Sequence, residues 1–177
     1  MPIKSLAVFC GSKPGNNPRF CEQAKELGYL LAQKKITLIY GGSDRGIMGA
    51  VANAVLEKNG AVVGIIPKLL TGWEHQHHGI TELHLVEDMH SRKRMLYEKS
   101  DAALILPGGY GTMDEFFEML TWNQLNIHDK KIIILNTDGF YDHLIMHLTK
   151  MEEEDFLYYK IIGKVTVITS PGELVLD

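Results

Sequence analysis

A glycine-rich segment carries the residues of this chain that are best suited to chemistry on an anion. Pro107-Gly-Gly-Tyr-Gly-Thr-Met-Asp-Glu115 stands between an apolar run and a stretch with helical spacing. Glycine lets main-chain amides approach a ligand closely, and the N–H groups and dipole at a helix start attract negative charge. We therefore expect a phosphate against Gly109, Gly111 and Thr112, although the glycines could also serve only a tight turn. No Gly-Lys-Ser/Thr follows, so the segment is not a Walker loop.

Glu115 ends this segment and has two interpretations. A carboxylate at the mouth of the expected pocket could activate water or offset a developing positive charge. Thr112-x-x-Glu115 also fits a capping box, in which the glutamate accepts hydrogen bonds from the first helical amides. Both interpretations can hold in part, and Asp114 and Glu118 offer alternative carboxylates nearby.

A second segment, Asp88-Met-His-Ser-Arg-Lys-Arg-Met95, places three cations near the start of an expected helix. Cations there oppose the helix dipole, so their presence needs another reason. A guanidinium can fork to a phosphate or a ribose oxygen, whereas lysine acts as a point charge. For Arg92 and Lys93 a ligand role and a solvated basic face are equally open, and for Arg94 we expect the solvated face.

The third segment, Tyr40-Gly-Gly-Ser-Asp-Arg-Gly-Ile-Met-Gly49, has the strand–glycine–helix context of a nucleotide-binding turn. It lacks the Gly-x-Gly-x-x-Gly spacing, so a dinucleotide site is weakly supported. Gly49, followed by Ala50, is expected to permit close packing of the helix on the sheet.

The histidines do not favour a metal site. His75, His77 and His78 cluster in the irregular stretch 67–80, and a second pair lies four residues apart at His143 and His147. Neither group has an evident third ligand, and zinc sites need three or four. We expect these side chains to contact solvent or a partner. Trp122 and Leu125, which extend the helix after the glycine segment, are expected to be core residues.

Short apolar runs alternate with longer stretches of helical spacing along the chain. The expected strands are 6–10, 36–40, 61–66, 84–86, 102–106, 131–135 and 164–168. The expected helices are 20–34, 47–58, 91–99, 112–124 and 141–153. Continuous apolar runs indicate strands buried on both faces, and helical crossovers between them indicate a parallel sheet. We predict one α/β domain over residues 1–177, a doubly wound, Rossmann-like parallel sheet with helices on both faces.

This fold class predicts where a ligand binds. In such sheets ligands lie outside the carboxyl ends of the strands. The turns that begin at Gly11, Gly41 and Gly108 all fall at such ends. We expect the site there, with 67–80 forming a long loop or a short lid.

Composition narrows the class of protein. The chain has 177 residues, a formal charge of −4 and 45% hydrophobic residues, values typical of one globular domain. The acidic balance gives no electrostatic reason to expect nucleic-acid binding. Two cysteines, Cys10 and Cys21, do not make a disulfide framework. The first ten residues lack the order of a signal peptide, and no apolar run reaches the roughly 18 residues of a membrane helix. A soluble cytoplasmic protein without membrane contact is expected.

Together the three segments resemble the LONELY GUY family, which is often mislabelled as lysine decarboxylases. The matching residues are 107–115, Met89-His-Ser-Arg-Lys93, and Tyr40-Gly-Gly with Gly46-Ile-Met-Gly49. Cys10-Gly-Ser12 and Thr121-Trp-x-Gln-Leu-x-Ile-His-Asp-Lys130 also look like the family. The resemblance spans nearly the whole chain, and the glycine–glutamate segment is its most specific part.

The resemblance implies a homodimeric phosphoribohydrolase that needs no cofactor and no metal. Family members cleave the N-glycosidic bond of cytokinin riboside 5'-monophosphates, releasing free base and ribose 5-phosphate, and many also act on AMP. Carried over by position, Arg92 and Glu115 are the catalytic pair. The expected substrate-binding residues are Ser12, Gly42, Asp88, Lys93, Gly108, Gly109, Tyr110, Gly111, Thr112, Met113, Asp114 and Thr121.

The implied chemistry suits these residue types. Breaking a ribosyl–base bond develops oxocarbenium character on the sugar, which the Glu115 carboxylate could stabilise while it orients water. Arg92 could anchor the phosphate or ribose so that the anomeric carbon faces this carboxylate. Asp88 is a candidate for protonating the leaving base.

Some positions depart from the family pattern. Ser43 stands where a third glycine is usual, and Asp44-Arg45 adds two charges to that turn. The stretch 67–80 is longer than in plant members and carries Trp73, Glu74 and the histidines. Because base selectivity is expected to depend on such a loop, the choice between prenylated adenine and plain AMP stays open.

Two rival functions remain on sequence grounds. A non-catalytic nucleotide or molybdenum-cofactor carrier on a related fold would use the same phosphate cradle without needing Glu115. A structural dimer could also bind phosphate adventitiously in its glycine loops. Lysine decarboxylation is not expected, because no pyridoxal-binding lysine motif is recognisable.

Overall fold

The structure is a computed structural model that describes residues 2–71, 75–158 and 163–176. Within these residues, seven parallel strands form one sheet. The strands are β1 (Ser5–Phe9), β2 (Thr37–Tyr40), β3 (Val62–Pro67), β4 (Glu82–Val86), β5 (Ala102–Ile105), β6 (Ile132–Leu135) and β7 (Val165–Ile168). The predicted parallel sheet is therefore confirmed.

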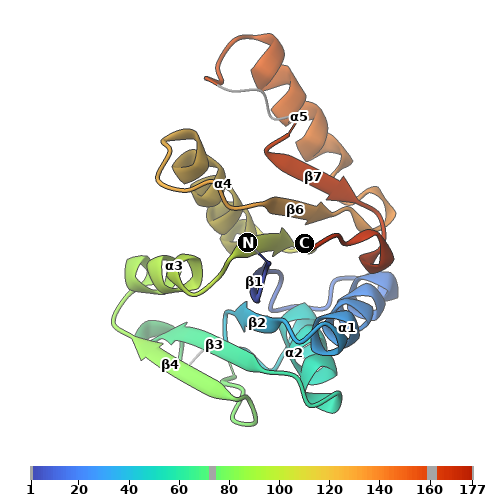
Figure 1. Cartoon of the computed structure of the whole chain (residues 1–177), viewed down its shortest axis with the longest axis vertical. Helices are drawn as coiled ribbons and strands as arrows, with labels where there is room; N and C mark the ends of the chain where they lie inside the picture. The colour runs from blue at the N-terminus through green and yellow to red at the C-terminus, as the bar shows by residue number, and fades with distance from the viewer. Residues whose placement is uncertain (1, 72–74, 159–162, 177) are drawn as a thin grey trace.

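Helices cover both faces of the sheet. They are α1 (Pro18–Gln33), α2 (Gly46–Glu57), α3 (Met89–Glu98), α4 (Tyr110–Gln124) and α5 (Asp142–Glu153), with short 3₁₀ turns η1 (Lys68–Leu70), η2 (Thr137–Gly139) and η3 (Pro171–Glu173). One core cluster joins α1 and α2 to one face, and a second joins α3, α4 and α5 to the other. Figure 1 shows this arrangement, with β4 at the bottom edge and β7 at the top. The doubly wound architecture follows from these two layers.

The order of the strands locates a crevice. The sheet runs β4-β3-β2-β1-β5-β6-β7, so the winding direction reverses between β1 and β5. These two strands pair in parallel from Leu6 and Ala102 to Phe9 and Ile105. Ligands in open α/β sheets bind at such a reversal, outside the carboxyl ends of the strands. The loops that follow β1 and β5 therefore form the centre of the expected site.

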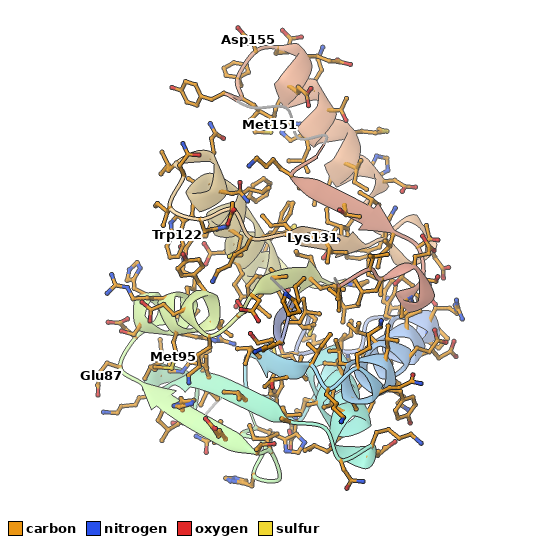
Figure 2. The ribbon with its side chains drawn as sticks, in the orientation of Figure 1. Glu87, Met95, Trp122, Lys131, Met151 and Asp155 are labelled. Atoms are coloured by element: carbon orange, nitrogen blue, oxygen red, sulfur yellow. The ribbon has the colours of Figure 1, made fainter. Side chains whose placement is uncertain are left out.

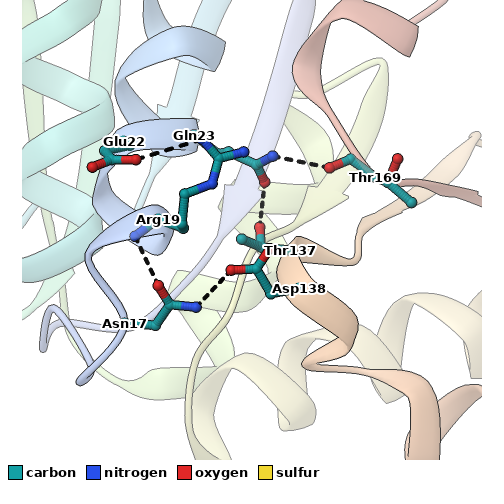
Figure 3. Close-up of polar contacts among 7 residues, drawn as sticks. All are labelled: Asn17, Arg19, Glu22, Gln23, Thr137, Asp138 and Thr169. Carbon is teal, nitrogen blue, oxygen red and sulfur yellow. Dashed lines mark hydrogen bonds and ion pairs between the residues drawn. The ribbon is translucent and has the colours of Figure 1, made fainter.

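Side-chain hydrogen bonds hold the loop after β1. Asn17 caps α1 by accepting from the Arg19 amide, and its Nδ2 donates to Asp138 in η2. Gln23, in the first turns of α1, bonds to the hydroxyl of Thr137 and to the carbonyl of Thr169 (Figure 3). These bonds join the segments after β1, β6 and β7 at the carboxyl edge of the sheet. One side of the crevice is thus fixed independently of any ligand.

The predicted elements agree with the observed ones to within a few residues at their ends. The five inner strands are almost entirely buried, as their continuous apolar runs predict, whereas the edge strands β4 and β7 are partly exposed. Among the described residues, no helix is long and apolar enough to cross a membrane. One of these boundary differences affects the interpretation of the site: α4 begins at Tyr110 rather than at Thr112.

Candidate active site

The glycine turns that follow β1 and β5 touch each other, and α2 packs beside them. The Gly11 amide donates to the Pro107 carbonyl at 3.0 Å, and the Met48 amide donates to the Gly11 carbonyl at 3.2 Å. A Cβ atom on Gly108 would lie 2.9 Å from the Gly11 nitrogen and 2.1 Å from the Thr112 hydroxyl. Only a residue without a side chain permits this approach. The structure therefore brings together turns that lie about a hundred residues apart in sequence.

The start of α4 is open. Gly109 occupies the N-cap position and no side chain caps the helix. Apart from chain neighbours and the backbone of α4 itself, no atom of the described residues lies within 4 Å of where a Cβ on Gly109 or Gly111 would stand, and Tyr110 is 97% exposed. The first amides of a helix have no partner within it and carry its positive dipole end. This environment favours the phosphate predicted at Gly109, Gly111 and Thr112, which stays a prediction.

The capping-box interpretation of Glu115 is wrong. Because α4 begins at Tyr110, Thr112 lies inside the first helical turn and Glu115 lies in the second. The Thr112 side chain is buried against Gly108 rather than capping the helix. The Thr112-x-x-Glu115 pair therefore does not form the N-terminal cap of α4.

Glu115 lies between α3 and α4, below the open helix start. The residue is 8% exposed and lines a small cavity of about 10 Å³. The other lining residues come from the end of β1 and from both helices: Phe9, Lys93, Leu96, Tyr97, Glu118, Met119 and Trp122. Figure 2 labels Trp122 on α4, and its ring meets Tyr97 of α3 edge-on at 5.1 Å. The carboxylate is thus held in the helix interface, deeper than the exposed mouth expected from sequence.

Arg92 projects from α3 against the glycine turn after β2. It is only 4% exposed, and its Nη2 donates to the Gly41 carbonyl at 3.3 Å. A Cβ on Gly41 would lie 2.2 Å from this Nη2, so glycine is needed for the guanidinium to fit. Nε is buried without a hydrogen-bond partner among the described residues. A buried unpaired donor costs about 1–3 kcal/mol, so this Nε is available to a ligand that could accept its hydrogen bond.

Lys93 joins α3 to α4 through two carboxylates. Its Nζ lies 3.1 Å from Asp114 Oδ2 and 2.6 Å from Glu118 Oε2. Burial alone would lower the pKa of Lys93, but the hydrogen bonds and charges of Glu118 and Asp114 outweigh it and raise the pKa. The ammonium therefore stays charged and positions the two helices. The predicted contacts of Lys93 and Asp114 with a nucleotide stay predictions.

Asp88 caps α3. Its carboxylate accepts from the Ser91 amide at 2.7 Å. This backbone hydrogen bond is the main reason that the pKa of Asp88 is lowered. A lowered pKa is the opposite of what a proton donor to a leaving base needs. The structure therefore argues against Asp88 as that donor, while its contact with substrate stays a prediction.

The remaining predicted site residues differ in placement. The Thr121 hydroxyl donates to the Phe117 carbonyl of its own helix at 2.7 Å. Met113 packs partly buried against the core on the α3–α5 face. Ser12 is exposed, and its main chain lies against Gly46, where a Cβ would come within 2.5 Å of the Ser12 oxygen. Gly42 has a φ of +84°, which favours glycine there. Of these residues, Gly42 and Ser12 adjoin the glycine turns most directly.

Two predictions about side-chain environment are wrong. His77 is buried and hydrogen-bonded to Asn53, instead of contacting solvent, because the segment around it folds back onto the turn after β2. Leu125 is 63% exposed, because α4 ends at Gln124 and Leu125 is its C-cap rather than part of its packed face. Arg94 is exposed, as predicted. Trp73 and Glu74 lie outside the described residues.

No metal site is found in the ranges that the structure describes, since no three His, Cys, Asp or Glu side chains come together there. Sequence reasoning missed the role of residues 75–77 and of Asn53 beside the glycine turn. No spacing or motif links Asn53 to His77, because the two residues lie 24 positions apart and meet only in the fold.

Known proteins resemble this chain in both sequence and fold. A family model described as "Possible lysine decarboxylase" matches residues 48–177. A cytokinin riboside 5'-monophosphate phosphoribohydrolase of Rhodococcoides fascians is 44% identical over 155 residues, which cover 87% of this chain and 78% of that protein. A protein of the same name from Arabidopsis thaliana is 43% identical over 155 residues, covering 88% of this chain and 73% of that protein.

Solved structures also share the fold. The molybdenum cofactor binding protein of Rippkaea orientalis superposes with a TM-score of 0.70 at 21% identity, covering 97% of this chain and 93% of that one. At this identity the likeness concerns the fold alone. The sequence comparisons therefore carry more weight than the structural one. They match this chain residue by residue at 43–44% identity, whereas the structural likeness extends only to the fold.

Proposed function

The chain belongs to the family of cytokinin riboside 5'-monophosphate phosphoribohydrolases, and from this premise we propose the reaction that it performs. It hydrolyses the N-glycosidic bond of a cytokinin riboside 5'-monophosphate and releases the adenine-type base and ribose 5-phosphate. AMP is included as a substrate. The observation that carries the proposal is the burial of two charged residues, Arg92 on α3 against the Gly41 turn and Glu115 on α4 in the α3–α4 interface.

The amides at the start of α4 hold the 5'-phosphate in this proposal. Gly109 and Gly111 leave the space that a phosphate needs, and the dipole of α4 supplies positive potential. Arg92 adds a fixed cation whose position Gly41 sets. Anchoring the phosphate and ribose orients the anomeric carbon for attack, which makes the reaction effectively intramolecular.

Glu115 acts on the sugar. As the bond to the base breaks, positive charge develops on the ribose ring, and a nearby carboxylate stabilises it. The same carboxylate orients a water molecule towards the anomeric carbon, accepts its proton as the C–O bond forms, and returns that proton to the departing base, which regenerates the carboxylate. Burial between α3 and α4 strengthens such electrostatic effects, since the local dielectric is lower than in water. Lys93, held by Asp114 and Glu118, fixes the spacing of the helices that carry the catalytic pair.

A base-release assay tests the proposal. The protein is incubated with AMP and with isopentenyladenosine 5'-monophosphate, and free base is separated by chromatography. We expect Glu115→Gln and Arg92→Ala to remain folded and to lose about 10²–10⁴-fold in kcat/KM. Glu118→Gln is the matched comparison on the same helix and should lose far less, because it acts through Lys93. Base release by Glu115→Gln at the wild-type rate would falsify the assignment.

The carrier function is the second candidate, and only the likeness in fold favours it. A carrier would bind the nucleotide and release no base, and loss of Glu115 would leave binding intact. Calorimetric titration of wild type and Glu115→Gln with AMP, run beside the assay above, separates the two. If both proteins bind AMP and neither releases base, the carrier function replaces the hydrolase function as the assignment.

We also propose that the chain acts as a homodimer of single-domain subunits, each comprising residues 1–177. The outer side of α4 and the turn after it expose the large hydrophobic side chains of Tyr110, Phe117, Leu125 and Ile127. Large apolar side chains exposed along one helix and the turn after it favour an interaction surface there, which a second copy would cover. Leu125→Glu should shift the mass in light scattering from dimer to monomer, whereas Leu69→Glu on η1 should not. A cytoplasmic location stays a prediction.

A further inference from the structure

The segment that follows η1 folds back over the glycine turn after β2. We call residues 75–77 the histidine strap. The Asp44 amide donates to the His75 carbonyl at 3.0 Å, and the His77 amide donates to the Gly42 carbonyl at 2.9 Å. Between these two bonds, Ser43 and Gln76 form an isolated antiparallel bridge. The strap is thus paired through its backbone with the glycine turn after β2.

One side chain locks the strap in place. His77 is 9% exposed, and its Nε2 lies 2.9 Å from Asn53 Oδ1 of α2. Its Nδ1 accepts a hydrogen bond from the Gly79 amide at 3.2 Å, which leaves the proton of the neutral ring on Nε2. Both ring nitrogens are therefore used. The neighbouring His75 and His78 are exposed, so only His77 is built into this contact.

The turn that the strap holds is the one that fixes Arg92. Gly41 adjoins Gly42, and its carbonyl accepts the hydrogen bond from the guanidinium. Gly42 itself has a φ of +84° and packs on β3, where a Cβ of Gly64 would come within 2.9 Å of its Cα. A turn of this conformation has little room to shift independently. Movement of Gly42 would therefore carry the Gly41 carbonyl with it.

We infer that the histidine strap positions Arg92 for the reaction proposed above, with His77 and Asn53 as the residues that hold it. This inference rests on the proposed function. The strap acts on the substrate only through the Gly41–Gly42 turn, so His77 and Asn53 are positioning residues rather than catalytic ones. A misplacement of about 1 Å in a substrate-anchoring group is enough to cost on the order of 10²-fold in rate.

The test measures both turnover and binding. His77→Ala removes both ring contacts, and we expect kcat/KM for AMP to fall at least about tenfold. His77→Gln keeps a donor for Asn53 and should restore part of the loss. His75→Ala and His78→Ala are matched controls in the same segment and should behave as wild type. If His77→Ala does not fold, Asn53→Ala removes the same hydrogen bond from an exposed position and gives the same test.

A double-mutant cycle separates positioning from stability. The affinity for ribose 5-phosphate, measured by calorimetry, is compared in wild type, His77→Ala, Arg92→Ala and the double variant. If the strap acts through Arg92, His77→Ala weakens binding in the wild-type background and has no further effect once Arg92 is absent. An equal loss in both backgrounds, or full activity of His77→Ala, overturns the inference.

The failure of this inference and that of the proposed function are distinguishable. If the wild-type protein releases no base from any monophosphate, the proposed reaction is wrong, and the cycle on ribose 5-phosphate still reports whether the strap positions Arg92. If the wild type is active and the His77 variants equal it, the reaction stands and the strap has no part in it.

Discussion

The glycine turns after β2 and β5 share a sequence pattern and have opposite environments. In the turn after β2, Gly41 lies against the Arg92 guanidinium, and Gly42 is held by the histidine strap. In the turn after β5, Gly109 and Gly111 face open space, and only Gly108 is tightly packed. The first turn therefore uses glycine to admit other parts of the protein, and the second uses it to leave room beside a helix start.

This difference shows that a strand–glycine–helix pattern can have two separate physical purposes. In the proposed function, close packing around Gly41 fixes the Arg92 side chain that anchors the ligand, whereas open space at Gly109 and Gly111 leaves main-chain amides to bind the ligand directly. Adding a methyl group at each turn should therefore have different consequences for stability and for activity.

Among changes within the two turns, the largest effect is expected for Gly41→Ala. The new Cβ would lie 2.2 Å from Arg92 Nη2 and 3.1 Å from Met48 Sδ, so both flexible side chains must move. Because the displaced guanidinium no longer anchors the substrate, kcat/KM for AMP should fall by about 10²-fold while the fold persists. Base release and circular dichroism together check this outcome. Wild-type kcat/KM in this variant would show that the position of the Arg92 guanidinium does not depend on Gly41.

Gly111→Ala should separate stability from activity. No atom obstructs the new Cβ, and alanine in a first helical turn stabilises by up to about 1 kcal/mol relative to glycine. The same methyl group occupies space intended for the phosphate, so kcat/KM should fall roughly tenfold. Urea denaturation and the base-release assay measure the two quantities. If the variant is more stable than wild type and its turnover is unchanged, the phosphate does not bind at this turn.

The smallest effect concerns the helix that presents Arg92 to the first turn. The backbone hydrogen bond from Ser91 lowers the pKa of Asp88 below its usual 3.8, so its stabilising charge is present above that value and is lost as the pH falls through the lowered pKa. An asparagine side chain at this position would cap the helix without this charge. Asp88→Asn should therefore be slightly less stable than wild type near neutral pH and lose less stability than wild type below about pH 4.

Thermal unfolding of both proteins across this pH range measures the effect, with Asp101→Asn, at the amino end of the inner strand β5, as a second carboxylate variant for comparison. Parallel loss of stability in wild type and Asp88→Asn would show that the cap carries no pH dependence.

Several features of the site were predictable from local sequence. The glycine segment 107–115, the cations of 88–95 and the turn at 40–49 all lie at strand ends, where the apolar runs predict them. The resemblance of these segments to a known family agrees with the comparisons. Local pattern was sufficient here because each motif follows a strand, and the continuous apolar residues of that strand predict its burial.

Other features depend on residues distant in the chain. Sequence could not distinguish a buried Arg92 from a solvated one, because the partner that buries it is the Gly41 carbonyl, 51 positions away. The capping box was a false local match, since the open turn at Gly109 lets α4 begin earlier. Nothing in the local sequence distinguishes His77 from His75 and His78. Its burial accompanies hydrogen bonds to Asn53 and Gly79.

The sequence by itself determined the elements and the places where chemistry is possible, because hydrophobic periodicity and glycine act over a few residues. The tertiary structure decided which charges are buried and which glycines face open space. It did so because burial and contact depend on segments that meet only when the sheet reverses its winding between β1 and β5.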